Sequence, residues 1–371
     1  MKITGIRILR LARELDPPFH AAWDPTPRRT FEATLVFVET SEGITGVGSG
    51  DTMAGFEGYE HLFVGEDPLA MVRHVRAIES INFHAGRYWP LEAALWDIAG
   101  QVCGQPVATL FGGAVKRVPA YASCGELKPP EERAEVALAL REEGFRAMKI
   151  RVDPERLEEG IASVRAAREA VGSSMEIMVD LNQAWRMAGD ARRSIDPVTA
   201  REIAGRLRDL DVFWLEEPLD ASDAKGLADL RAASGVRIAG GEMARTVPEL
   251  LAYIEADSLD VYQPDVVLAV GMMRARTVAE LAMARNRHFT PHTWTNGIGV
   301  LANLHVTAGV SGGPYLEFPY DPPGWTPERR DFMLAEPLRI DAGGCLNVPD
   351  LPGLGVVLDE DVLRGLGKVT G

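Results

Sequence analysis

The chain has 371 residues, 46% of them hydrophobic and 25% charged, which is ordinary globular usage with room for a large core and a second, smaller domain. Its net charge of −15 argues against nucleic acid and anionic membranes as partners, because both attract basic surfaces. The three cysteines lack metal-ligand spacing and the first sixteen residues contain no apolar leader, so we expect reduced thiols and a cytoplasmic enzyme with no membrane span.

The first third of the chain carries strand and helix patterns that do not alternate regularly. Residues 2–10 and 32–40 are apolar runs that favour strands, and a loop rich in Pro and Arg joins them. Helical patterns then cover roughly residues 68–80 and 90–103. We therefore predict an α+β domain over residues 1–117.

From Val118 onward, strand, loop and helix patterns follow one another regularly. The first helix opens at Pro130 and ends at Gly144, and later strand-like runs begin at Ala147, Glu176, Val212, Arg237, Leu259, Phe289 and Tyr315. The count is eight strands but seven clear helices, because the chain after Tyr320 is Pro-rich rather than amphipathic. We predict a parallel α/β barrel over residues 118–336, followed by a segment, 337–371, that returns to the first domain.

Acidic or imidazole side chains close six of the apolar runs in the barrel region. These residues are Asp180, Glu216, Glu242, Asp265, His292 and Glu317. Parallel strands open their carboxyl ends on the same side of a barrel, which is where such barrels carry their catalytic groups. We therefore expect the six side chains to share one site.

Three of these carboxylates, those of Asp180, Glu216 and Glu242, stand at successive strand ends. Each alone could cap a helix or pair with an arginine, but three on neighbouring strands are better explained by a shared cation. Because the set contains no Cys or His, it suits a hard octahedral ion and favours Mg²⁺ over Zn²⁺. Glu217 follows Glu216 directly and is predicted to face the opposite side of its strand, in a structural role.

Two pairs of residues complete the chemistry that the sequence indicates. Asp265 and His292 close adjacent strands, so the carboxylate can hold one imidazole nitrogen and leave the other to take and return a proton. Lys149 and Arg151 are two apart on the second strand of the barrel and therefore share one strand face. Two cations on one face need anions between them, which the three carboxylates and an anionic substrate would supply.

With these residues in place, the chain resembles the enolase superfamily and, within it, the mandelate racemase subgroup. Residues 91–100 and 110–113 are similar to segments of the family's capping domain, and residues 349–356 are similar to its returning segment. The resemblance covers the whole chain. It implies an α/β fold, a modified TIM barrel of the form (β/α)7β, with a capping domain built from the N-terminal region and the C-terminal segment.

The resemblance also implies roles for the site residues. The three carboxylates would bind Mg²⁺, His292 with Asp265 would act as base or acid on one face of the substrate, and Glu317 would hydrogen-bond the substrate carboxylate. Lys149 corresponds to the first lysine of the family's Lys-x-Lys motif, whereas Arg151 replaces the second, which is the base on the opposite face. No lysine accompanies Asp265, which separates the chain from the muconate cycloisomerase subgroup.

The reaction implied is abstraction of the proton α to a carboxylate, with the enediolate held by Mg²⁺. Arginine is a poor proton acceptor, so the replacement at Arg151 disfavours a two-base racemisation. We expect His292 to take the α-proton and then protonate a departing β-hydroxyl, which dehydrates an acid sugar to a 2-keto-3-deoxy acid. This is the chemistry of a lyase.

Two alternatives remain open. The first is an isomerase, a racemase or epimerase that uses His292 and Lys149, and it requires burial and Arg151 to lower the pKa of Lys149. The second is a non-catalytic, Mg²⁺-dependent binder of acid sugars.

Specificity is expected to come from loops around the barrel mouth. By resemblance, the loop at residues 17–29 closes over the site, and it offers Trp23, His20 and Arg28 for the distal end of the substrate. Asn182 shares a strand face with Asp180, and Trp294 follows His292 by two positions, so both are candidates to line the pocket. The family resemblance further favours a symmetric homo-oligomer.

Overall fold

The computed structural model describes residues 1–84, 86–366 and 368–370. An antiparallel sheet contains the strands of the N-terminal region. The sheet has the strand order β13–β1–β2–β3, with bounds β1 Ile3–Phe19, β2 Arg28–Thr40, β3 Thr45–Ser49 and β13 Lys368–Thr370. Helix α2 (Trp89–Cys103) packs on this sheet, and α1 (Met71–Asn82) and α3 (Val107–Leu110) pack on α2. Two short 3-10 helices, η1 (Phe56–Gly58) and η2 (Glu60–Leu62), precede α1.

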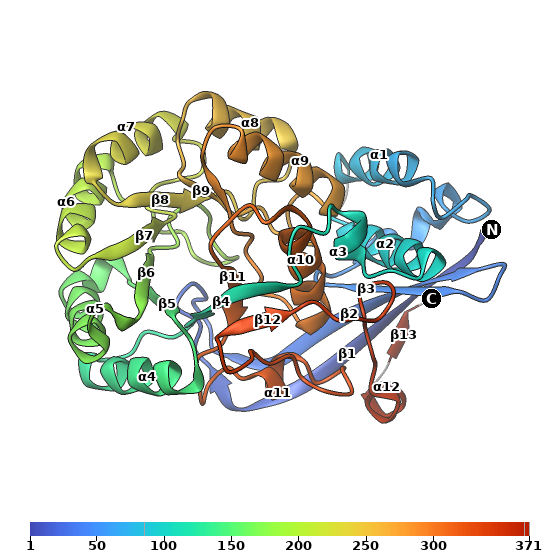
Figure 1. Ribbon diagram of the computed structural model, residues 1–371, viewed down its shortest axis with the longest axis horizontal. Helices are drawn as coiled ribbons and strands as arrows, with labels where there is room; N and C mark the ends of the chain where they lie inside the picture. Colours follow the sequence, from blue (N-terminus) through green and yellow to red (C-terminus); the bar gives the residue numbers. More distant parts are fainter. Residues whose placement is uncertain (85, 367, 371) are drawn as a thin grey trace.

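The remainder of the described chain is built around parallel strands in the order β10–β9–β8–β7–β6–β5–β4–β11. Their bounds are β4 Arg117–Ser123, β5 Ala147–Arg151, β6 Glu176–Asp180, β7 Val212–Glu216, β8 Arg237–Gly240, β9 Val261–Tyr262, β10 His288–Phe289 and β11 Leu316–Pro319. The helices between them are α4 Pro130–Glu143, α5 Leu157–Val171, α6 Pro197–Arg208, α7 Ala224–Ser234, α8 Val247–Glu255, α9 Met272–Met283 and α10 Gly297–Val310. Figure 1 shows α4 to α9 as an arc around the strands, with the antiparallel sheet on the other side. This is the predicted barrel with a capping domain.

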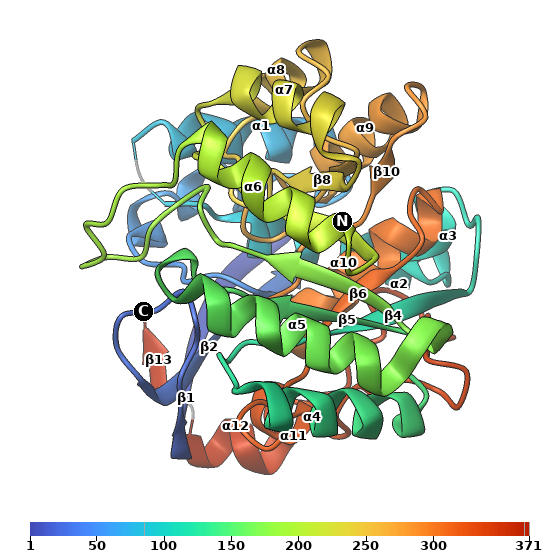
Figure 2. The same ribbon diagram turned by 90° about the vertical axis from the view of Figure 1, so that its left-hand side faces the viewer.

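Local sequence explains why these elements begin and end where they do. Strand β6 is buried along nearly its whole length, as expected for a strand that has helices on one face and the barrel interior on the other. Pro130 starts α4 with a fixed φ, and Gly144 ends it in the left-handed region at φ 113°. Asp196 caps α6 by accepting the N–H groups of Val198 and Thr199. Figure 2 shows α4, α5 and α6 side by side over strands β4, β5 and β6.

The N-terminal strands are longer than predicted. Strand β1 runs to Phe19 rather than ending near residue 10, and β2 begins at Arg28. The two prolines at the end of β1 lie where its pairing with β2 is irregular, between Glu14 and Phe19, which is a position where a sheet tolerates proline. The connection is therefore the loop of residues 20–27 at the tip of a long hairpin.

After β11 the chain contacts both parts of the molecule. A short helix, α11 (Pro327–Arg330), is followed by β12 (Cys345–Asn347), which pairs antiparallel with β4 of the barrel. The chain then passes through α12 (Glu360–Leu366) to β13, which pairs with β1. Among the described residues, no helix combines the length and the apolar character needed to cross a membrane.

Buried carboxylates on α2 connect this helix to the barrel and to the C-terminal segment. Glu92 accepts the N–H groups of Met272 (3.0 Å) and Met273 (2.9 Å) at the start of α9, and burial raises its pKa to about 7. Asp97 accepts the N–H of Leu354 at 2.7 Å, and burial raises its pKa to about 6. Glu92 thereby joins α2 to the barrel, and Asp97 joins α2 to the segment that follows β12.

Candidate active site

The three carboxylates predicted to bind a metal come together at the carboxyl end of the barrel. Asp180 ends β6, Glu216 ends β7 and Glu242 follows β8 by two residues. One oxygen from each lies within 4.8 Å of the others, and all three side chains are fully buried or nearly so. Because β6, β7 and β8 are parallel neighbours in the sheet, strand ends far apart in sequence become adjacent.

Two of these carboxylates, those of Glu216 and Glu242, are oriented by neighbours that sequence reasoning did not single out. Gln263 donates from Nε2 to Glu216 Oε2 at 2.9 Å, and Trp214 donates from Nε1 to the same oxygen at 3.0 Å. Trp185 donates from Nε1 to Glu242 Oε1 at 2.9 Å. Such outer contacts restrict the rotation of prospective metal ligands.

The donor set fits Mg²⁺. Glu242 Oε2 is buried and has no hydrogen-bond partner among the described residues, so it is available as a ligand. Burial raises the pKa of Glu216 and of Glu242, because charged carboxylates are poorly solvated there and repel one another. A divalent cation would offset both effects, and three oxygen donors without nitrogen or sulfur suit a hard ion.

Lys149 and Arg151 extend from β5 toward the carboxylates. The Lys149 ammonium contacts Glu216, lies 2.8 Å from Glu317 Oε1 and lies 3.4 Å from Asp180 Oδ2. Burial and Arg151 each lower the pKa of Lys149, but the carboxylates outweigh them and its pKa is raised. This shift is opposite in direction to the lowering that the isomerase alternative requires, because Glu216, Glu317 and Asp180 together outweigh burial and Arg151.

Arg151 is held on several sides. Its guanidinium contacts Asp180, donates to Asn182 Oδ1 at 3.1 Å and donates from Nε to the Cys124 carbonyl at 3.2 Å. The pKa of Arg151 is raised despite burial, mainly by Asp180. Arg151 is thus a fixed cation beside a prospective metal ligand.

Asp265 and His292 form the predicted pair. His292 Nδ1 lies 2.9 Å from Asp265 Oδ2, and its Nε2 lies 3.8 Å from Glu242 Oε1. Burial lowers the pKa of His292, but Glu242, Glu317 and Asp265 together raise it to about 9. The arrangement leaves Nε2 facing the carboxylate cluster, where it can exchange a proton with a bound substrate.

Glu317, at the start of β11, lies between the basic groups. Ser123 donates from Oγ to Glu317 Oε1 at 2.7 Å, and the Thr293 N–H donates to Oε2 at 2.6 Å. Burial raises its pKa, but Lys149, His292 and Arg151 outweigh burial, so the pKa is lowered. Glu317 is therefore held as a charged carboxylate.

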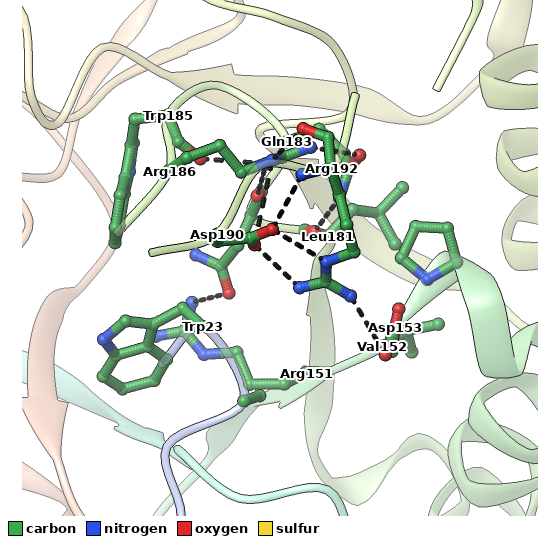
Figure 3. A pocket seen from close by; sticks show the side chains of 13 residues that line it. Trp23, Arg151, Val152, Asp153, Leu181, Gln183, Trp185, Arg186, Asp190 and Arg192 are labelled. Carbon is green, nitrogen blue, oxygen red and sulfur yellow. Dashed lines mark hydrogen bonds and ion pairs between the residues drawn. The ribbon is translucent and has the colours of Figure 1, made fainter. Parts of the chain in front are cut away.

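Figure 3 shows the pocket beside this cluster, with Trp23 next to Arg151. The Arg151 guanidinium carbon lies 4.6 Å from the Trp23 ring centre and 5.8 Å from that of Trp294. Both distances fall within the range of cation–π contacts. Asn182 also lines this pocket, so three of the five substrate-binding candidates surround Arg151.

The other two candidates are placed differently. His20 is exposed and is not among the residues that line the pocket. Arg28 forms an ion pair with Asp24 at 3.0 Å, and its guanidinium carbon lies 5.6 Å from the Trp23 ring. Its charge is therefore already matched by a carboxylate, which weakens the expectation that it meets a second acidic group on the substrate.

Sequence position could have pointed to some of the supporting residues. Gln263 precedes Asp265 by two and so shares its strand face, and Ser123 closes β4 just as the acids close their strands. Trp185 and Asn303 had no such signal, because each reaches the site from a loop or helix whose path depends on the fold.

Comparisons with known proteins agree with this geometry. A family model described as Enolase C-terminal domain-like matches residues 131–362. The chain is 32% identical over 360 residues to the 3,6-anhydro-alpha-L-galactonate cycloisomerase of Streptomyces coelicolor. The aligned region covers 91% of each protein. It is 30% identical over 277 residues to the arabinonate dehydratase of Saccharolobus solfataricus, and the aligned region covers 74% of this chain and 70% of the relative.

A solved structure of a racemase from Streptomyces coelicolor with bound magnesium has a TM-score of 0.84 and 29% identity to this chain. The match covers 99% of this chain and 100% of the other. The matched relatives comprise cycloisomerases, acid-sugar dehydratases and a racemase.

Proposed function

Because the chain belongs to the enolase superfamily, in its mandelate racemase subgroup, we propose that it is a Mg²⁺-dependent acid-sugar dehydratase. It removes the proton α to the substrate carboxylate and then expels the β-hydroxyl as water, which yields a 2-keto-3-deoxy acid. When bound by Asp180, Glu216 and Glu242, Mg²⁺ supplies a Lewis acid that stabilises negative charge on the substrate carboxylate. Relatives named for arabinonate, D-gluconate and D-xylonate support the substrate class.

The observation that carries this proposal is the contrast between His292 and Arg151. His292 is held through Nδ1 by Asp265 and presents Nε2 to the carboxylate cluster, so it can accept the α-proton. As imidazolium it can return a proton to the β-oxygen on the same face, and that oxygen leaves as water. Arg151 stays protonated and pinned to Asp180, so it contributes positive charge but no second base.

Lys149 and Glu317 contribute binding and orientation in this scheme. The Lys149 ammonium is fixed between Glu216 and Glu317, where it adds positive charge next to the substrate carboxylate. Ser123 and the Thr293 N–H fix the orientation of Glu317, which we assign to the substrate end that carries the carboxylate. A charged group held in place in a dry site acts without the cost of reorienting during the reaction.

A second candidate is the isomerisation of a cyclic acid sugar, which is favoured by the full-length similarity to two cycloisomerases. The first step is the same removal of an α-proton by His292. If the β-oxygen is part of a ring, its departure opens the ring and no water is lost. A racemase would need Lys149 as its second base, and Glu216, Glu317 and Asp180 together raise the pKa of Lys149.

The experiment is proton NMR in D₂O with MgCl₂, using acyclic mono- and diacid sugars, their ring-closed forms and simple 2-hydroxy acids. A keto-deoxy product is expected. An isomer of a ring-closed acid instead supports the second candidate, and α-deuteration with formation of both epimers supports a racemase. Binding without any exchange across the panel would contradict an enzymatic role. His292→Asn should abolish turnover, whereas His288→Asn, at the start of β10 and outside the site, should not.

A further inference from the structure

A second cavity, of about 430 Å³, lies where the capping domain meets the barrel, with α1 and the start of α2 on one side and α8 and α9 on the other (Figure 1). We call it the seam cavity, and the lining residues that matter most are Asn82, Trp89, Arg245, Val247, Val270 and Arg274. None of the three prospective metal ligands lines it, and neither Lys149 nor His292 does. The volume is within the range of small-molecule sites.

One wall of the seam cavity is apolar and held in place. Trp89 is 2% exposed and donates from Nε1 to the Ala269 carbonyl at 2.8 Å, so its ring has a fixed orientation. Val270 is 1% exposed, and Val247 begins α8. The cavity therefore offers a preformed surface for the apolar body of a ligand.

The charges that line the seam cavity leave one cation without a partner. Arg274 donates to both carboxylate oxygens of Glu79, at 2.7 Å and 3.0 Å, so the charges of this pair cancel. The pair also joins α1 to α9. Arg245, in the loop before α8, is the remaining charged residue of the lining. A local positive charge on a chain with a net charge of −15 favours an anionic ligand at this point.

The carboxylates around Arg245 are engaged elsewhere. Glu249 accepts the backbone N–H of Arg245 at 3.0 Å and the Thr246 hydroxyl at 3.0 Å, in the cap of α8. Asp51 lies 3.6 Å from Arg87, and Arg245 has a weaker effect than Arg87 on the pKa of Asp51. Within the described part of the chain, neither acid forms an ion pair with the Arg245 guanidinium, which is left for a ligand.

Asn82, the last residue of α1, supplies the second polar anchor. Its Oδ1 is buried and has no hydrogen-bond partner among the described residues. A buried amide group without a partner is unfavourable, and a ligand that meets it removes that penalty. A hydroxyl group suits this position, because it can donate to the oxygen of a carboxamide and can also accept from its NH₂ group.

We propose that the seam cavity binds a small organic acid that has an apolar body and a hydroxyl group. The carboxylate pairs with Arg245, the apolar body lies against Trp89, and the hydroxyl meets Asn82. Such a ligand contacts α1 and the loop before α8 together, so it also links the capping domain to the barrel. No residue assigned to the dehydration lines this cavity, and the inference does not depend on that function.

The test is a ligand-observed NMR titration of the Mg²⁺-saturated protein with 4-hydroxybenzoate, 4-hydroxyphenylacetate and 3-(4-hydroxyphenyl)propanoate. These probes move the carboxylate away from the ring one carbon at a time. The same acids without the hydroxyl test the contact with Asn82, and the primary amides of the hydroxy acids test the charge. At least one hydroxy acid should bind with saturation, and its two comparison compounds should each bind about fivefold more weakly.

Two variants test the two anchors separately. Arg245→Gln should weaken binding of the hydroxy acid about fivefold and leave binding of its amide unchanged. Asn82→Leu should remove the preference for the hydroxyl, and it should not lower the Tm, because it deletes a buried oxygen without a partner. Arg245 is exposed, so its variant remains informative if Asn82→Leu does not fold. Arg201→Gln makes the same charge change at an exposed position on α6 and should leave binding unchanged.

A further titration separates the seam cavity from the metal site, because aromatic acids can also bind a metal ion. EDTA replaces MgCl₂, at a temperature below the Tm of the metal-free protein, and binding of the hydroxy acid should persist. The proposal is overturned if binding is lost with EDTA, if no acid in the panel binds, or if the amides bind as well as the acids. Equal binding by the Arg245→Gln and Arg201→Gln variants, or an unchanged preference for the hydroxyl in Asn82→Leu, would also overturn it.

Discussion

Asn303 Nδ2 lies 3.2 Å from Asp265 Oδ1, on the side of the carboxylate that faces away from His292. The same oxygen accepts the N–H groups of Val267 (2.8 Å) and Leu268 (3.2 Å), and Asn303 Oδ1 accepts the N–H of Val266 (3.1 Å). Asn303 therefore fixes both Asp265 and the backbone that follows it. The orientation of the proposed catalytic imidazole therefore depends, through Asp265, on a helix residue that lies 38 positions after Asp265.

Replacing Asn303 with leucine should lower kcat about tenfold and change KM little, because a charge-assisted hydrogen bond that orients the base is lost while the substrate contacts remain. Steady-state kinetics on the substrate found by NMR measure this. Thr307→Val on the same helix is the matched control, since Thr307 is buried but its hydroxyl has no partner among the described residues. An equal loss in both variants would mean that Asn303 acts only through general stability.

Replacing Trp23 with leucine should lower kcat/KM by between about 2-fold and 30-fold, since the cation–π contact with Arg151 is lost at the mouth of the site. Trp23→Phe keeps an aromatic face and should retain most of the activity. Kinetics of the two variants side by side provide the measurement. If both variants match the parent protein, Trp23 does not position Arg151.

Removing divalent cations should destabilise the protein, because the buried carboxylates of Asp180, Glu216 and Glu242 then repel one another. At a MgCl₂ concentration about 100 times the Kd, binding to the folded state alone adds about 2.7 kcal/mol. The expected result is a rise in Tm with MgCl₂ that EDTA reverses. Glu242→Gln should lose most of this rise, whereas Glu158→Gln on the surface should keep it.

The buried His305 should make the protein less stable in mild acid. Its Nδ1 accepts the Ala108 N–H at 2.9 Å, its Nε2 lies 3.1 Å from the Leu354 carbonyl, and burial lowers its pKa to about 4. Since the unfolded imidazole has a pKa of about 6.5, the unfolded state binds the proton first. The free energy of unfolding should therefore decrease as the pH is lowered from about 6.5, and it should level off below about pH 4. The total loss from this group is about 3 kcal/mol.

Urea unfolding at several pH values, comparing the parent protein with His305→Gln, isolates this contribution. The variant should be less stable at pH 7, because two buried hydrogen bonds change, and the difference between the two proteins should shrink as the pH falls from 6.5 to 4. A constant difference across this range would show that burial does not lower the pKa of His305 in the folded state.

Local patterns were enough to predict the barrel and the residues at its mouth. An apolar run closed by an acid indicates a buried parallel strand and the end at which its side chain emerges, so Asp180, Glu216 and Glu242 could be placed together before the fold was known. The ends of β1 and β2 were less predictable. Cross-strand pairing within the hairpin, rather than local composition, extended β1 past its two prolines to Phe19.

The sequence by itself determined the repeating strands and helices, the acids at successive strand ends and the family, because all of these follow from short-range periodicity and residue type. Only the tertiary structure decided which partner each charge meets. Lys149 keeps a raised pKa, Arg28 is paired with Asp24, and Glu217 faces a cavity. Those outcomes depend on distances of a few ångströms that the fold sets between charged side chains, and electrostatic interactions in a buried site change steeply over such distances.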